Sequence, residues 1–145
     1  MNQQTNNAEE TQKLGAEFAK QLQGGEVLLL VGEVGAGKTT FVQGLGSALG
    51  VQDHIKSPTF VIVHEHQVHN HKTIKHLIHL DGYRLGKTPL SELGVDQFCG
   101  RADTVIAIEW PEQLDFDLED CQVTHQIDFK HLEQDQREII IQPQP

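Results

Sequence analysis

GEVGAGKTT, residues 32–40, is the stretch of sequence that decides the fold. It fits the phosphate-loop pattern G-x-x-x-x-G-K-[ST] at every position. The apolar run VLLLV at 27–31 precedes it, and apolar residues recur at helical spacing over 41–49. An uninterrupted apolar run bounded by glycines is typical of a strand that is buried on both faces. The sequence therefore predicts a strand, a phosphate-binding loop and a helix, in that order.

The loop has the chemistry that a nucleotide phosphate needs. Glycines let successive backbone N–H groups approach phosphate oxygens closely, and the helix that follows points its positive end at the same anion. Lys38 is expected to reach the β- and γ-phosphates, Thr39 to offer its hydroxyl to Mg²⁺, and Thr40 to contact the α-phosphate. The expected nucleotide-binding residues of the loop are Glu33, Val34, Gly35, Ala36, Gly37, Lys38, Thr39 and Thr40.

The remaining periodicity predicts an α/β protein. An amphipathic helix is expected first, and a polar, histidine-rich turn is expected inside a hairpin. A short helix is expected after Pro89, and the last two strands are expected to be antiparallel and near a sheet edge. The predicted helix is 8–22, and the further predicted strands are 59–64, 73–80, 104–108, 121–129 and 138–141.

Length and composition limit the possible functions. The 145 residues suit one domain, 1–145, with frayed ends at 1–7 and 142–145. The chain shows no leader and no apolar stretch long enough to span a bilayer, so we expect a cytoplasmic protein with no membrane contact. The formal net charge of −10 opposes direct binding to RNA, since neutralisation of phosphates supplies most nucleic-acid affinity.

Two carboxylates end apolar strands, Asp81 in HLIHLDGYRL and Glu109 in TVIAIEWP. Open α/β sheets place ligand groups at the carboxyl ends of their strands. A phosphate loop needs such an acid to hold Mg²⁺ or to position the nucleophile. The residues alone do not decide which acid has which role. Arg137 and Arg84 are candidates to neutralise charge in the transition state, ahead of Arg101.

Histidines and cysteines carry weaker signals. Six of the nine histidines fall between His64 and His79, where we expect a solvated hairpin without a metal ligand set. His79 lies two positions before Asp81, on the same strand face. Cys99 and Cys121 have no zinc-ligand spacing, and we expect them to be buried packing thiols without a disulfide.

These segments together resemble one family, TsaE. The segments that carry the resemblance are EET-x-x-LG at 9–15, the loop at 32–40, SPTF at 57–60, HLDGYRL at 79–85 and the pair Glu109-Trp110. A phosphate loop alone is common to many families, but this ordered set is specific. TsaE is the small P-loop ATPase of bacterial tRNA threonylcarbamoyladenosine (t6A) biosynthesis.

The resemblance implies a three-layer P-loop NTPase fold with a mostly parallel central sheet. It also implies weak ATPase activity with ATP and Mg²⁺, exerted on the TsaB and TsaD proteins, with tRNA contacted only indirectly and a monomer when free. Thr39 and Glu109 would hold Mg²⁺, and Asp81 would serve hydrolysis together with Lys38. Thr11 would lie near the nucleotide, Trp110 near the phosphates, and Arg137 is added to the nucleotide-binding set.

Other functions stay open at this point. A small P-loop kinase that phosphorylates a metabolite is the main alternative, although the short chain leaves little room for a lid or an arginine-rich acceptor pocket. A GTPase is disfavoured because no N-K-x-D segment is present. An ATP-gated binding module without significant hydrolysis is the non-enzymatic alternative.

Overall fold

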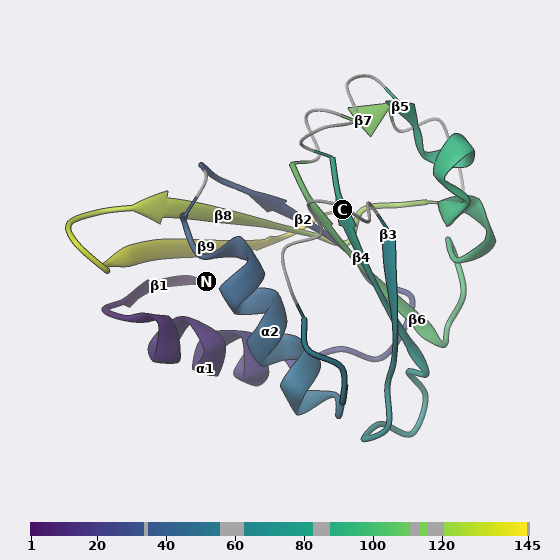
Figure 1. Ribbon diagram of the computed structural model, residues 1–145, viewed down its shortest axis with the longest axis horizontal. Coiled ribbons are helices and arrows are strands. Elements are labelled where there is room, and N and C mark those ends of the chain that lie inside the picture. The colour runs from purple at the N-terminus through teal and green to yellow at the C-terminus, as the bar shows by residue number, and fades with distance from the viewer. Residues whose placement is uncertain (34, 56–62, 83–87, 111–113, 116–120, 145) are drawn as a thin grey trace.

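A mixed seven-stranded sheet is the centre of the described molecule, with strand order β1-β9-β8-β2-β6-β4-β3 (Figure 1). The computed structural model describes residues 1–33, 35–55, 63–82, 88–110, 114–115 and 121–144. Neighbours β8, β2, β6 and β4 are parallel, whereas β9, β1 and β3 pair antiparallel at the edges. The strands are β1 (Asn2–Thr5), β2 (Val27–Val31), β3 (Val63–Gln67), β4 (His76–Asp81), β6 (Thr104–Glu109), β8 (His125–His131) and β9 (Arg137–Pro143). The expected α/β fold with a parallel centre is confirmed.

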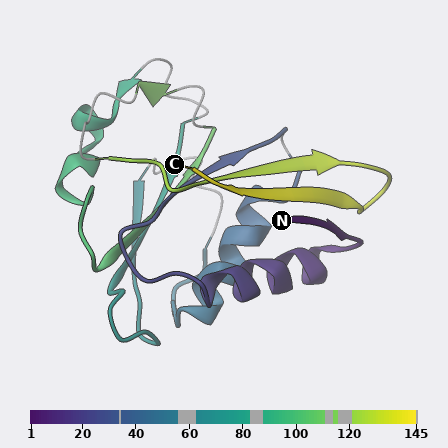
Figure 2. The same cartoon turned by 180° about the vertical axis from the view of Figure 1, so that it is seen from behind.

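Two helices, α1 (Ala8–Ala19) and α2 (Lys38–Ala48), cover one face of the sheet, as Figure 2 shows from behind. The Asn7 side chain caps α1 by accepting a hydrogen bond from the Glu10 amide at 2.8 Å. The helix ends at Ala19 rather than at residue 22, because the next amides bond in tighter turns. The helices approach so closely that a Cβ on Gly44 would collide with the Gln12 carbonyl.

Side chains alternate between two cores, one on each face of the sheet. Leu28 and Leu30 of β2 pack with α1 and α2, whereas Ile106 and Ile108 of β6 pack on the other face. That second face is covered by two short 3-10 helices, η1 (Leu90–Leu93) and η2 (Val95–Gln97), near the two-stranded pair β5 (Thr88–Pro89) and β7 (Leu114–Asp115). Because side chains alternate along each strand, the side chain at the end of a strand lies on one defined face of the sheet.

A disulfide joins Cys99 and Cys121 in this second core, with Cα atoms 4.8 Å apart. The expectation of two separate packing thiols is therefore wrong. Cys99 follows η2 and Cys121 precedes β8, and both pack in the second core, where the fold brings the sulfurs together. Sequence spacing alone carries no signal for such a contact.

Both ends of the described chain, where we expect frayed segments at 1–7 and 142–145, contain residues that pair with strands of the sheet. β1 pairs with β9 from Asn2↔Ile140 to Thr5↔Arg137, and Pro143 still pairs with His125. These polar segments lack the apolar alternation of a strand. Backbone hydrogen bonds, including Met1 N to Ile141 O at 2.9 Å, hold them at the sheet edge instead.

The histidine-rich segment is also more regular than expected. β3 runs through His64 and His66, and the connection to β4 comes later, at 68–75. Pairing with β4 determines this, since His64 lies opposite His79 and His66 opposite Leu77. The first part of the predicted strand, 59–62, lies outside the described residues. In the described parts of the chain, no helix has the length and apolar character needed to cross a membrane.

Candidate functional site

The loop at 32–40 connects the end of β2 to the start of α2, as the sequence predicts. Gly37 occupies the N-cap position of α2 with φ of 102°, which L side chains rarely adopt. The glycine therefore allows the chain to turn directly from the loop into the helix. The positive end of α2 then faces the loop, an arrangement that favours an anion.

Lys38 is buried against this loop, with 5% of its surface exposed. Its ammonium donates hydrogen bonds to the Gly32 carbonyl and, at 3.1 Å, to the Glu33 carbonyl. It also lies 3.8 Å from the centre of the Trp110 ring, a cation–π contact. Trp110 follows β6 in a left-handed conformation with φ of 57°. Lys38 and Trp110, both predicted site residues, are therefore in contact.

Two carboxylates end neighbouring strands beside α2. Asp81 and Glu109 are register partners at the carboxyl ends of β4 and β6, and both are buried, with 7% and 3% exposure. The Thr39 hydroxyl donates to the Glu109 carboxylate, with separations of 2.9 and 3.1 Å to its two oxygens. The structure thus brings Asp81, Glu109 and Thr39 to one end of the parallel strands.

Thr11 of α1 and Arg137 of β9 also lie beside the loop. A Cβ built on Gly37 would lie 3.5 Å from Thr11 Cγ2 and 3.9 Å from Arg137 Cγ. The Arg137 guanidinium donates to the Gly35 carbonyl at 2.8 Å, and the Thr11 hydroxyl shares a 2.8 Å hydrogen bond with Thr5. Both residues, which we expect at the nucleotide, therefore lie beside the loop. Thr5 joins this group because β1 and β9 are neighbours, which the sequence does not reveal.

Some predicted residues lie elsewhere or outside the described chain. Arg101 precedes β6, at the opposite end of that strand from Glu109, and pairs with Asp103 at 2.9 Å. The hydrogen bond from Arg101 lowers the pKa of the Asp103 carboxyl. Arg101 is therefore a surface ion-pair residue, and its candidacy at the site is wrong. Val34 and Arg84 lie outside the described residues.

His79 is the site residue that sequence reasoning missed. Its Nε2 lies 2.5 Å from Glu109 Oε2, and its side chain is fully buried. The position of His79 two residues before Asp81 indicates only a shared strand face. The contact with Glu109 depends on β4 and β6 being neighbours in the sheet.

Two further histidines, His64 and His66 of β3, lie beside His79. Burial lowers the pKa of both, and the nearby His79 lowers each further.

The donor set at Thr39 fits Mg²⁺. This hard cation takes oxygen ligands and is usually held by one or two carboxylates together with substrate phosphates and water. A hydroxyl and a carboxylate in hydrogen-bond contact, next to a phosphate-binding loop, are donors of this type. Among the described residues, no group of three or more His, Cys, Asp or Glu forms a metal cage by itself.

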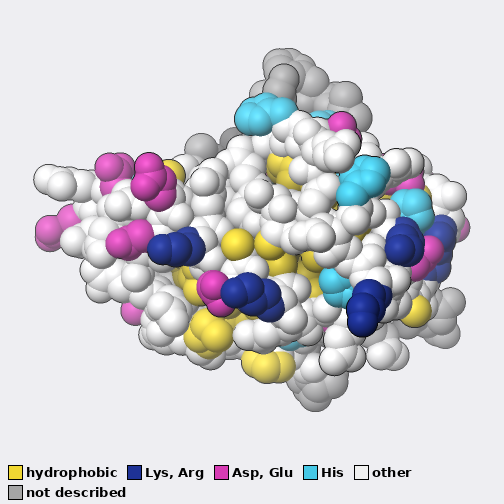
Figure 3. Space-filling view, turned by 90° about the horizontal axis from the view of Figure 1, so that it is seen from below, with side chains coloured by type: hydrophobic (Ala, Val, Ile, Leu, Met, Phe, Trp, Pro, Cys, Tyr) yellow, Lys and Arg dark blue, Asp and Glu magenta, His cyan; other side chains and the backbone are white. Residues whose placement is uncertain are grey.

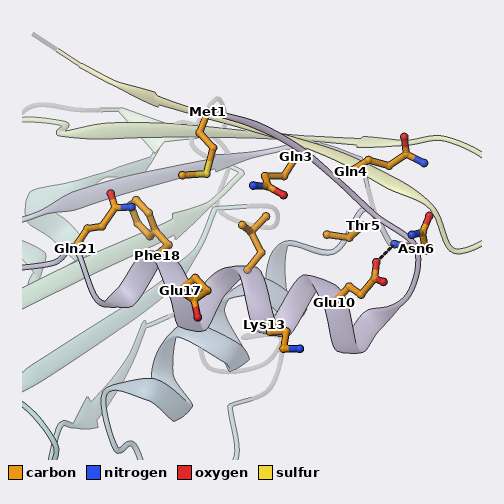
Figure 4. A pocket seen from close by; sticks show the side chains of 11 residues that line it. Met1, Gln3, Gln4, Thr5, Asn6, Glu10, Lys13, Glu17, Phe18 and Gln21 are labelled. Atoms are coloured by element: carbon orange, nitrogen blue, oxygen red, sulfur yellow. Dashed lines mark hydrogen bonds between the residues drawn. The ribbon is translucent and has the colours of Figure 1, made fainter.

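A separate cavity of about 540 Å³ lies between β1 and α1 (Figure 4). Its lining includes the side chains of Gln3, Gln4, Lys13 and Glu17, with Phe18 at the base of one end. None of the described residues of the loop at 32–40 lines it. The chemistry described above therefore lies outside this cavity.

Comparisons with known proteins agree with this geometry. The family model described as threonylcarbamoyl adenosine biosynthesis protein TsaE matches residues 5–139. The tRNA threonylcarbamoyladenosine biosynthesis protein TsaE of Synechocystis sp. is 42% identical over 107 residues, which are 72% of this chain and 66% of that protein. The Bacillus subtilis protein of the same name is 38% identical over 138 residues, or 93% of this chain and 80% of that protein.

A solved structure shows the same fold. The crystal structure of Bacillus subtilis YdiB matches with a TM-score of 0.69 at 33% identity, covering 96% of this chain and 82% of YdiB. The matched part of this chain spans slightly less than two thirds of the Synechocystis relative, at 66%. The family model nonetheless extends from β1 to β9, across the loop and both strand-end carboxylates. The chain belongs to the TsaE family of threonylcarbamoyl adenosine biosynthesis proteins.

Proposed function

We propose that this chain binds Mg·ATP at the loop 32–40 and hydrolyses it in the service of tRNA threonylcarbamoyladenosine biosynthesis. The TsaE family takes part in that biosynthesis. The observation that carries the ATPase proposal is the contact between the Thr39 hydroxyl and the buried Glu109 carboxylate. That contact lies at the first turn of α2, where a nucleotide-bound metal needs oxygen ligands.

Each side chain has a role that follows from its place. Lys38 exchanges its carbonyl partners for the β- and γ-phosphates and neutralises their charge. Thr39 and Glu109 hold Mg²⁺, which supplies Lewis-acid stabilisation of the phosphoryl oxygens when bound. Asp81, buried at the end of the adjacent strand, accepts a hydrogen bond from the attacking water and orients it.

The backbone of residues 33–40 and the side chains of Thr11, Trp110 and Arg137 surround the nucleotide in this proposal. Trp110 packs against Lys38, and Arg137 is bonded to the loop at Gly35. Thr40, in the first turn of α2, contacts the α-phosphate. Arg137 can also neutralise the negative charge that develops on the γ-phosphate during hydrolysis. Among the described arginines, it is the one that is hydrogen-bonded to the loop.

The surface supports a role that depends on partner proteins. The net charge is −10, and on the face carrying the helices Lys and Arg side chains are interspersed with Asp and Glu (Figure 3). The described residues of this face form no continuous basic patch of the kind that tRNA phosphates attract. We propose that TsaB and TsaD hold the tRNA and that this chain acts on their complex in the cytoplasm.

A multiple-turnover modification assay tests this function. TsaB, TsaD and tRNA are supplied with the threonylcarbamoyl donor, and ATP hydrolysis and t6A are followed with and without this chain. Repeated turnover that requires both this chain and hydrolysable ATP is expected. Modification that never depends on this chain, together with phosphorylation of a metabolite, would instead establish the kinase alternative.

A further inference from the structure

We propose that His79 is a positioning residue that fixes the orientation of the Glu109 carboxylate toward the metal. The inference deepens the proposed function and rests on it. His79 contacts Glu109 directly, with Nε2 2.5 Å from Oε2, and side-chain exposures are 0% for His79 and 4% for Glu109. Carboxylates that bind a metal are themselves hydrogen-bonded by groups behind them, which fix their orientation.

The sheet places the imidazole beside the carboxylate. Side chains two residues apart on a strand share a face, so His79 and Asp81 of β4 point to the same side as Glu109 and Ala107 of β6. Ala107 is the register partner of His79. Its single methyl group leaves room for the ring to reach along β6 to Glu109.

The hydrogen-bonding groups define which atom donates. A carboxylate accepts hydrogen bonds, so His79 Nε2 is the donor. His79 Nδ1 is buried and has no hydrogen-bond partner among the described residues. The only polar contact that orients this imidazole within the described chain is therefore the one to Glu109.

Glu109 has two described donors, His79 and Thr39. The Thr39 hydroxyl is itself an expected metal ligand and would offer its oxygen to the metal. His79 is not an expected metal ligand, and among the described residues its one hydrogen bond is to Glu109. His79 is therefore the donor whose hydrogen bond to Glu109 stays the same with and without metal.

His64 is a matched control for His79. It is the direct cross-strand partner of His79 on β3 and shares its sheet face. Its described ring contact is with His66, at 5.9 Å between ring centres, and not with Glu109. Replacing His64 thus changes a histidine in the same part of the sheet without changing the carboxylate's donor.

Two amide variants separate positioning from packing. In His79→Gln the amide nitrogen can take the place of Nε2, whereas in His79→Asn the shorter side chain brings it only to the place of Nδ1. Both variants introduce the same polar group, so a general burial penalty affects both. Mn²⁺ binding in the presence of a non-hydrolysable ATP analogue, measured by electron paramagnetic resonance, reports the metal site without turnover. Analogue binding without metal and thermal unfolding report the rest of the fold.

We expect Mn²⁺ affinity in His79→Asn to fall about 10- to 100-fold, the usual effect of removing a hydrogen bond behind a metal ligand. His79→Gln and His64→Gln should remain close to the parent, and metal-free analogue binding should be equal in all variants. Equal Mn²⁺ affinity in the parent and His79→Asn would overturn the positioning role alone. Equal losses in the Asn and Gln variants would also overturn it. A parent chain that binds no Mn²⁺ with the analogue would overturn the proposed function as well.

Discussion

Replacing Thr39 with valine removes the hydroxyl and keeps the shape of the side chain. The hydroxyl donates to the Glu109 carboxylate at 2.9 Å, and Glu109 is 3% exposed. A hydrogen bond to a charged group contributes about 1.5–3 kcal/mol. Because His79 still donates to the same carboxylate, we expect the lower end of that range. Threonine and valine have similar helix propensities, so the backbone of α2 adds little to the difference.

A loss of about 1.5–2 kcal/mol lowers the Tm of a domain of this size by roughly 3–8 °C. Thermal unfolding of Thr39→Val and Thr39→Ser without nucleotide measures this effect, since serine keeps the hydroxyl. Mg²⁺-dependent ATPase activity should fall in the valine variant and persist in the serine variant. The reasoning is refuted if the two variants have the same Tm and the same Mg²⁺ dependence.

Three further results are expected. Asp81→Asn should retain ATP binding and lose about 100-fold or more in turnover, as for a group that positions the nucleophile, and unchanged single-turnover hydrolysis would contradict this role. Reducing the Cys99–Cys121 disulfide, whose cysteines are 22 residues apart, should lower the free energy of unfolding by about 3 kcal/mol in denaturant titrations, and identical curves with and without reductant would exclude it. Burial lowers the pKa of His66 below 6.5, so on acidification the imidazole is protonated in the unfolded chain before it is protonated in the folded chain. The free energy of unfolding should therefore decline as the pH falls below about 6.5, and His66 should add no pH dependence above that value. His66→Gln should flatten that decline, and an unchanged pH profile would be inconsistent with a buried neutral His66.

The parts of the fold with local signals were predictable from the sequence. The run 27–31, the loop 32–40 and the helix behind it match the structure because each has its own apolar period or backbone requirement. β1 was missed because NQQT has no apolar alternation, and its strand conformation comes from pairing with β9. β3 continues into the histidine-rich segment for the same reason, because β4 lies beside it.

The site divides in a similar way. Lys38 and Thr39 belong to a motif with fixed spacing, so their places follow from the sequence. Asp81 and Glu109 were identified as strand-end acids, but their register pairing depends on the sheet order. The bond from His79 to Glu109 and the disulfide are tertiary contacts, and a single sequence contains no periodic signal for either.

The central claim is that the loop binds the phosphates of ATP through Lys38. Calorimetric titration of the parent chain, Lys38→Ala and Lys20→Ala with a non-hydrolysable ATP analogue and Mg²⁺ tests it most directly. Lys20 is the control because its side chain is 69% exposed and pairs only with Glu17 among the described residues. The parent and Lys20→Ala should bind alike, and Lys38→Ala should bind about 10- to 150-fold more weakly, as expected for a lost charged hydrogen bond. Equal affinity in all three chains would contradict the claim.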